Sequence, residues 1–236
     1  MGQKKLIRFE AIKTFPNVLQ YPENMAGNWN TFFKNEHPLT LELACGKGEY
    51  VVSLSALYPD HNFLGVDIKG NRLYVGAKAC IDRKLYNAAF LRAQIISIDK
   101  YFSSDEVSEI WITFPDPQLR ISKAKKRLTH PSFLRLYQKF LKPGAPIHLK
   151  SDSPDLYAFT KLVIEMYGLI LQEDRDDLYA STELTQEQQI KTHYEKLDIA
   201  ESKKIHYLRF SLPDTIPMLD EALQQKLVET KTHEEE

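Results

Sequence analysis

Apolar residues recur along this chain in short runs, and the segments between the runs show helical periodicity. The runs are bounded by Pro, Gly or polar residues, which is typical of buried strands. The expected strands cover residues 39–45, 63–66, 88–92, 109–114, 147–150, 169–172 and 206–212. The segments between them predict helices over residues 49–58, 71–86, 132–141 and 155–166.

This alternation predicts βαβ units and therefore an α/β fold, a doubly wound, mostly parallel sheet of the Rossmann-like class. Ligands of such sheets bind outside the carboxyl ends of the strands, where the strand order reverses. We expect the α/β domain to span residues 39–212, after an N-terminal extension over 1–38 that is irregular apart from a short helix near 29–34. The tail over 213–236 has apolar residues at helical spacing, and it either packs on the body or frays.

Length and composition are those of one ordinary globular domain: 236 residues, 43% hydrophobic and 27% charged. No apolar run follows the basic residues Lys4, Lys5 and Arg8, so we expect no signal peptide. No stretch approaches the roughly 20 apolar residues of a membrane span. Cys45 and Cys80 lack metal-ligand spacing, so we expect a reduced, cytoplasmic protein without a metal site.

A glycine-containing turn follows the first predicted strand, with Glu42 just before Gly46 and Gly48. The glycines allow a tight turn and the close approach of a ligand. The pattern differs from the dinucleotide motif G-x-G-x-x-G, because Val51 stands where its third glycine would fall. A carboxylate here disfavours a pyrophosphate and suits a cationic sulfonium. Taken alone, the motif is equally compatible with a plain strand-to-helix turn.

Asp67 ends the next predicted strand, where an acidic residue of a nucleotide-binding fold can accept both ribose hydroxyls. A lone aspartate at such a position is more often a helix cap or a solvated strand end. Together with the preceding glycine turn, Asp67 favours a cofactor site that binds a nucleoside.

A third motif follows the predicted strand 109–114, where Asp116 stands between Pro115 and Pro117. The prolines fix the backbone and forbid helix or ladder there, so the carboxylate is held rigidly at a strand's carboxyl end. In isolation this motif is an ordinary turn.

A run of basic residues comes next along the chain. Its members are Arg120, Lys123, Lys125, Lys126 and Arg127. A charge run is usually a solvated face, and the net charge of −1 gives no global basic footprint. Because this run adjoins the candidate site, we predict that it contacts a phosphate backbone. Residues near the N-terminus, Lys4, Lys5, Arg8 and Lys13, could extend the same positive surface.

Taken together, these motifs resemble the bacterial tRNA (guanine-N7-)-methyltransferases over residues 39–212. The similar motifs are Glu42 with Gly46 and Gly48, the strand 63–67, the sequence 114–117 with the basic run, Lys150 to Asp152, Thr192 to Glu195, and the late strand 205–210. The resemblance implies a class I methyltransferase that uses S-adenosylmethionine to methylate N7 of guanine 46 in the variable loop of tRNA.

The resemblance also implies roles for individual residues. It places Glu42, Asp67, Gln94 and Asp116 at the cofactor and makes Asp116 the catalytic residue. It places Arg120, Asp152, Thr192, His193, Tyr194 and Glu195 at the tRNA, beside the basic residues Lys125, Lys126 and Arg127. Taken alone, Asp152 is typical of a helix N-cap, and 192–195 of a surface loop.

The chain departs from the family pattern with Ala44 for the first glycine, Gln94 for a usual aspartate and Arg120 for a lysine. Gln118 and Leu119 stand where Trp and another residue are common. Three other functions stay open. A methyltransferase of exocyclic amines is disfavoured, because no aromatic residue follows Pro117. An NAD-dependent oxidoreductase is disfavoured by Val51 and Glu42. An RNA-binding relative without turnover is compatible with Gln94. Both a monomer and a homodimer are compatible with the sequence.

Overall fold

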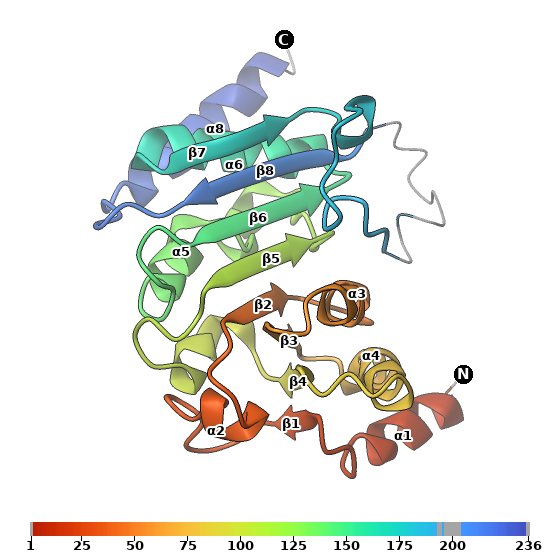
Figure 1. Ribbon diagram of the computed structural model, residues 1–236. Helices are drawn as coiled ribbons and strands as arrows, with labels where there is room; N and C mark the ends of the chain where they lie inside the picture. Colours follow the sequence, from red (N-terminus) through yellow and green to blue (C-terminus); the bar gives the residue numbers. More distant parts are fainter. Residues whose placement is uncertain (1, 193–194, 196–203, 235–236) are drawn as a thin grey trace.

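The structure is a computed structural model, which describes residues 2–192, 195 and 204–234. The described residues form one eight-stranded sheet with helices on both faces (Figure 1). The strands are β1 (Val18–Gln20), β2 (Leu39–Leu43), β3 (Asn62–Asp67), β4 (Ala88–Arg92), β5 (Glu109–Thr113), β6 (Pro146–Ser151), β7 (Ile170–Arg175) and β8 (His206–Ser211). The α/β prediction is confirmed.

The strand order is β1-β4-β3-β2-β5-β6-β8-β7, and β8 alone among the described strands runs opposite to the others. From β2 the chain first builds outward through β3 and β4, and then returns to place β5 on the other side of β2. The order therefore reverses between β2 and β5. In open α/β sheets this reversal marks the ligand site, at the carboxyl ends of the strands.

The predicted helices are present, with ends that shift by a few residues. They are α3 (Glu49–Leu57), α4 (Gly70–Asp82), α5 (Pro131–Tyr137) and α6 (Pro154–Tyr167), joined by the short 3-10 helices η1 (Ile95–Tyr101), η2 (Ile121–Lys126) and η3 (Leu178–Ala180). The central strands are buried on both faces, as in parallel sheets covered by helices. One core includes residues of α5 and α6, and the other includes residues of α3 and α4.

The prediction of an irregular N-terminal segment is wrong in two places. Residues Gly2–Ala11 form helix α1, and β1 pairs in parallel with β4 as an edge strand of the same sheet. Helix α1 depends on tertiary packing: a Cβ on Gly70 would lie 2.6 Å from Ile12 and 3.1 Å from Phe9. Such contacts are invisible to local propensity. The predicted short helix is confirmed as α2 (Trp29–Phe33).

The tail forms helix α8 (Asp220–Glu234), which packs on the body at its first turn. Leu223 is buried, and Asp220 accepts hydrogen bonds from Arg135 at 2.5 Å and from Tyr167 at 3.1 Å. No helix in the described part of the chain is both long and apolar enough to cross a membrane.

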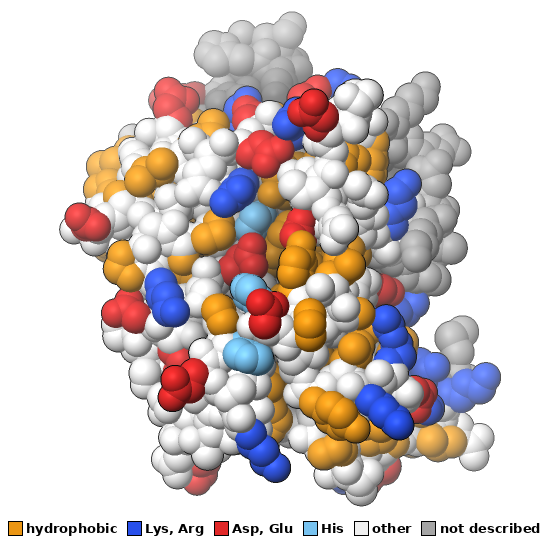
Figure 2. All heavy atoms as spheres, viewed as in Figure 1, with side chains coloured by type: hydrophobic (Ala, Val, Ile, Leu, Met, Phe, Trp, Pro, Cys, Tyr) orange, Lys and Arg blue, Asp and Glu red, His pale blue; other side chains and the backbone are white. Residues whose placement is uncertain are grey.

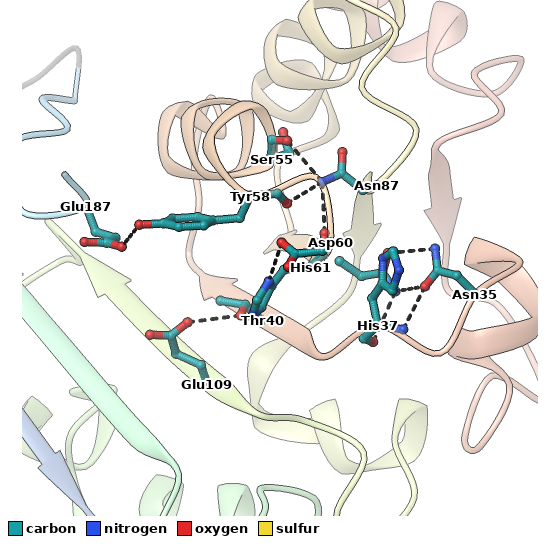
Figure 3. A network of polar contacts seen from close by, with 11 residues as sticks. Asn35, His37, Thr40, Ser55, Tyr58, Asp60, His61, Asn87, Glu109 and Glu187 are labelled. Atoms are coloured by element: carbon teal, nitrogen blue, oxygen red, sulfur yellow. Dashed lines mark hydrogen bonds and ion pairs between the residues drawn. The ribbon is translucent and has the colours of Figure 1, made fainter.

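A polar network fixes the amino ends of the central strands, at the edge opposite the candidate site (Figure 3). Asn87 donates to the carbonyl oxygens of Ser55, Tyr58 and His61 at 2.9–3.0 Å. The Thr40 hydroxyl donates to Glu109 and thereby links the starts of β2 and β5. The loop ends at this edge are thus held by side-chain amides and carboxylates, while the carboxyl edge is left to carry ligands.

Candidate active site

Parallel pairing brings the predicted site motifs to one edge of the sheet. Leu43 of β2 is in register with Val66 of β3 on one side and with Ile112 of β5 on the other. Thr113, which precedes the Pro-Asp-Pro loop, pairs with Lys150 at the end of β6. The glycine turn, Asp67 and Asp116 therefore follow three adjacent strand ends.

The turn after β2 is built from left-handed residues. Ala44, Gly46 and Gly48 have φ values of 56°, 57° and 69°. A Cβ on Gly48 would lie 2.4 Å from the ring of Phe90, so only glycine fits there. Ala44 adopts the same region with a methyl group, at some cost in strain. The turn thus folds back tightly and starts α3 directly over the sheet.

Asp67 holds this turn in place. One carboxylate oxygen accepts the Gly46 N–H at 3.0 Å, and the other accepts the Lys69 N–H at 2.7 Å. The side chain is buried at 7% exposure. Each carboxylate oxygen can accept a further hydrogen bond, so Asp67 can order the glycine turn and still bind ribose hydroxyls.

A cavity of about 320 Å³ opens beside Asp67. It is lined by Ala44, Asp67, Ile68, Ala93, Gln94, Ile95, Ile96 and Phe133. Mostly apolar walls with two polar side chains suit a flat purine and its ribose. Asp67 and Gln94 of the predicted cofactor residues belong to this lining, whereas Glu42, Gly46, Gly48 and Asp116 do not. The aliphatic walls were not found from the sequence, because they resemble ordinary core residues.

Glu42 is buried inside the end of β2. Its carboxylate accepts the Thr113 hydroxyl at 2.8 Å and the Val51 N–H at 3.2 Å. Burial raises the pKa of Glu42 from its ordinary value near 4.5 to about 8, against the lowering effect of these two hydrogen bonds. Glu42 therefore links β2, β5 and α3, and it can switch to the carboxylate when a cation binds nearby.

Asp116 is exposed on a rigid loop. Two residues near it, Phe114 and Gln118, have left-handed φ values of 47° and 49°. The carboxylate accepts the Gln118 N–H at 3.1 Å. The two prolines and the strained residues fix the backbone of this loop, and strain of this kind gathers at functional sites. The prediction of a rigidly held carboxylate agrees with this geometry.

The basic run divides into exposed and buried members. Arg120, Lys123, Lys125 and Lys126 lie on or beside η2 and are exposed. Arg127 is buried at 4% exposure, and this contradicts its predicted role as a phosphate ligand. Its guanidinium donates to the carbonyl oxygens of Pro117 and Gln118 at 3.2–3.3 Å. It also lies 4.4 Å from the Phe159 ring centre. Arg127 therefore clamps the Asp116 loop from inside.

A second basic region lies away from this run. Lys and Arg side chains gather over α1 and α4, at the lower right of Figure 2. Helix α1 carries exposed Lys4, Lys5 and Arg8. Lys13, just after α1, is also exposed and pairs with Glu10 at 2.8 Å. All four predicted N-terminal basic residues are therefore exposed.

The remaining predicted substrate residues have mixed placements. Asp152 follows β6, but the N-cap of α6 is Ser153, which accepts the Leu156 N–H at 3.2 Å. Thr192 is buried, and it exchanges hydrogen bonds of 3.3 Å with Glu195 in the reciprocal manner of a capping box. His193 and Tyr194 lie outside the described residues.

The sheet and its cavity define a class of protein. Seven of the strands lie in the order β4-β3-β2-β5-β6-β8-β7, with β8 antiparallel. A glycine turn follows β2, and an acidic residue ends β3. Together these features are the architecture of a class I methyltransferase.

Comparison with solved structures agrees. The 16S rRNA methyltransferase KamB has a TM-score of 0.61 at 14% identity, covering 79% of this chain and 94% of that one. The 16S rRNA (adenine(1408)-N(1))-methyltransferase from Catenulisporales acidiphilia has a TM-score of 0.57 at 12% identity, over 80% and 93% of the two chains. At these identities the likeness establishes the fold alone.

Sequence comparison identifies the family. A family described as "Putative methyltransferase" matches residues 36–208. The tRNA (guanine-N(7)-)-methyltransferase of Porphyromonas gingivalis is 46% identical, over 85% of this chain and 86% of its own. Those of Bacteroides thetaiotaomicron and Christiangramia forsetii are 43% and 42% identical, over 90% of this chain and 87% and 100% of theirs. The chain belongs to the tRNA (guanine-N(7)-)-methyltransferase family.

Proposed function

We propose that this protein transfers the methyl group of S-adenosylmethionine to N7 of guanine 46 in the variable loop of tRNA. The observation that carries the proposal is the pairing, at one sheet edge, of a nucleoside-sized cavity containing Asp67 with the rigid Asp116 loop. The names of relatives at 42–46% identity support the same substrate.

The cavity residues fit the adenosine part of this cofactor. Asp67 retains acceptor capacity for the ribose hydroxyls, and Gln94 can donate to and accept from an adenine edge. The aliphatic walls of Ile68 and Ile96 suit the faces of the base. When bound, S-adenosylmethionine would supply a methyl carbon attached to a sulfonium. A buried carboxyl such as Glu42 is compatible with that positive charge.

Guanine N7 has an in-plane lone pair and no proton, so this reaction needs no general base. The protein has to align the guanine with the methyl group, and alignment alone can contribute several kcal/mol. Asp116 is suited to this task, because its loop is fixed by the flanking prolines and by Arg127. Methylation makes the purine cationic, and the Asp116 carboxylate stabilises that charge.

The exposed residues Arg120, Lys123, Lys125 and Lys126 would then bind the tRNA phosphates. They directly follow the loop that carries Asp116, on or beside η2, so phosphate contacts there would bring a splayed base to the site. Sequence-specific recognition of RNA generally uses such unpaired bases.

The test is to incubate the protein with labelled S-adenosylmethionine and unmodified tRNA, and then to digest the RNA and identify the modified nucleoside. We expect 7-methylguanosine that disappears when guanine 46 is replaced by adenine. A different methylated nucleoside would contradict the assigned atom. Cofactor and tRNA binding without any methyl transfer would instead indicate an RNA-binding relative that has lost turnover.

A further inference from the structure

Lys150 has an unusual environment that the proposed chemistry does not use. It lies near the end of β6, and its side chain is fully buried. The ammonium donates to the Ile190 carbonyl at 2.8 Å, to the Gln188 carbonyl at 3.1 Å and to the Tyr179 hydroxyl at 2.9 Å. Glu195 lies 3.3 Å from it. Every one of these acceptors comes from the segment between β7 and β8.

This arrangement is costly if it serves only to fill the core. Three aromatic rings surround the ammonium, with the centres of Tyr50, Phe114 and Tyr179 at 5.7, 5.9 and 5.2 Å. Desolvation lowers the pKa of Lys150 to about 8. An apolar side chain of similar volume would avoid this desolvation. What the ammonium adds is a set of directed hydrogen bonds to backbone carbonyls.

The same residue also holds the Asp116 loop. The Lys150 carbonyl accepts the Phe114 N–H at 2.8 Å, directly before Pro115 and Asp116. The backbone of Lys150 thus anchors the catalytic loop, and its side chain anchors the segment that carries Thr192 and Glu195.

The other contacts of the segment show what the ammonium contributes. Tyr58 binds Glu187, as Figure 3 shows, and Gln188 donates to Glu173 at 3.1 Å. These bonds fix the part of the segment that lies toward β7 and the amino edge of the sheet. At the carboxyl edge, Lys150 binds the carbonyl of Ile190 just before Thr192.

We propose that Lys150 is a positioning residue that sets residues 188–192 and Glu195 against the Asp116 loop, so that the tRNA base is accepted in the reactive orientation. This inference rests on the proposed function. It assigns Glu195 and Thr192 to the support of the site: Glu195 binds Lys150, Tyr179 and Thr192.

The test compares Lys150→Met with Lys161→Met in the full-length protein. Lys161 is a matched control, because it also has a carboxylate partner, Asp174 at 2.7 Å, and an aromatic neighbour, Tyr157, but it is half-exposed on α6. We expect Lys150→Met to lower the single-turnover rate of tRNA methylation by at least about tenfold, as small misplacements do. Its affinity for S-adenosylmethionine in calorimetry should stay within about twofold of wild type, because the cavity lies on the other side of β2.

Tyr179→Phe is the second variant, because it retains the ring and loses only the hydroxyl that binds Lys150 and Glu195. We expect a smaller loss of rate and faster amide hydrogen exchange over residues 186–192, with no change in α3 or α4. If Lys150→Met does not fold, the methylation rate and hydrogen exchange of Tyr179→Phe test the proposal instead. Wild-type rate and exchange in the folded variants would overturn the role of Lys150. A wild-type protein that never methylates tRNA would instead overturn the proposed function.

Discussion

The two halves of the site are built by different means. In the proposed cofactor half, β2 to β4, a buried carboxylate holds the turns: the Asp67 side chain accepts the amides of Gly46 and Lys69. In the substrate half, β5 onward, buried cations hold the loops: Arg127 binds the carbonyls of Pro117 and Gln118, and Lys150 those of Gln188 and Ile190.

In the substrate half, the basic residues fall into a buried group and an exposed group. Arg127 and its neighbour Lys126 carry the same charge, but one is buried and the other is exposed. A buried cation is committed to protein carbonyls, and an exposed one is free to bind a phosphate. Substitutions in one half should therefore change one binding or rate constant and leave those of the other half intact.

The largest effect is expected from Asp116→Ala. Its rate of methyl transfer should fall by about a hundredfold or more, as when an electrostatic interaction of the transition state is removed. Cofactor affinity should not change, because Asp116 does not line the cavity. Single-turnover kinetics with saturating tRNA measure the rate, and Asp116→Asn separates charge from shape. A rate within twofold of wild type would place catalysis elsewhere, and Asp152 would be tested next.

The next effect concerns the cofactor half. Asp67→Ala should weaken binding of S-adenosylmethionine by about ten- to a hundredfold, the range for removal of a charged hydrogen bond. Part of the weakening reflects the released amides of Gly46 and Lys69. Calorimetry measures the affinity, and thermal unfolding measures stability. tRNA affinity should be unchanged. A folded variant with wild-type cofactor affinity would remove Asp67 from the site.

Arg127→Met should lower the methylation rate by roughly tenfold through the loosened Asp116 loop. The salt dependence of tRNA binding should stay the same, because a buried guanidinium releases no counterion. Lys126→Met is the matched control, with an unchanged rate at saturating tRNA. If Arg127→Met flattens the salt dependence of tRNA binding, as removal of a phosphate ligand does, the buried role of Arg127 is contradicted.

The exposed lysines should show the opposite behaviour. In the triple variant Lys123→Ala, Lys125→Ala and Lys126→Ala, tRNA binding should weaken, with the log–log salt slope reduced by roughly 0.7 to 0.9 for each phosphate that the protein no longer neutralises. Binding titrations at several salt concentrations measure this slope. A slope equal to that of wild type would make η2 merely a solvated surface.

The smallest effect is a pH dependence of cofactor binding. Burial raises the pKa of Glu42 to about 8, so free protein holds a proton there at neutral pH. A bound sulfonium favours the carboxylate, and binding therefore releases protons. Affinity should rise a few-fold from about pH 6.5 to 8 and then level off, because above the pKa of about 8 the free protein has already lost this proton. Glu42→Gln should remove the trend. Proton uptake on binding by wild type would contradict this assignment.

The same contrast explains what could be predicted. Strand β4 was predicted with its observed ends, and the glycine turn and Asp67 were readable as local motifs. The burial of Arg127 could not be predicted, because it depends on a contact with Phe159 in α6. The role of Lys150 depends on a segment about forty residues later, at Ile190. The strand did carry a signal of a special role for Lys150, because His148 and Lys150 lie on the same face of an otherwise apolar strand.

Helix α1 and the pair Thr192–Glu195 show two further limits. Helix α1 has few apolar residues of its own and is stabilised by contacts of Phe9 and Ile12 with Gly70. The spacing Thr-x-x-Glu is a capping-box signature, but the sequence alone does not show that Lys150 lies beneath it. Motifs that are local in the sequence could be predicted, whereas contacts of a side chain with a distant segment could not.

The central claim is that the nucleophile is N7 of guanine 46, oriented by Asp116. The most direct measurement is single-turnover methylation of two tRNAs that differ only in whether position 46 carries guanine or 7-deazaguanine. The account predicts that the deaza tRNA binds with similar affinity and receives no methyl group. Methyl transfer to the deaza tRNA at the wild-type rate would contradict it.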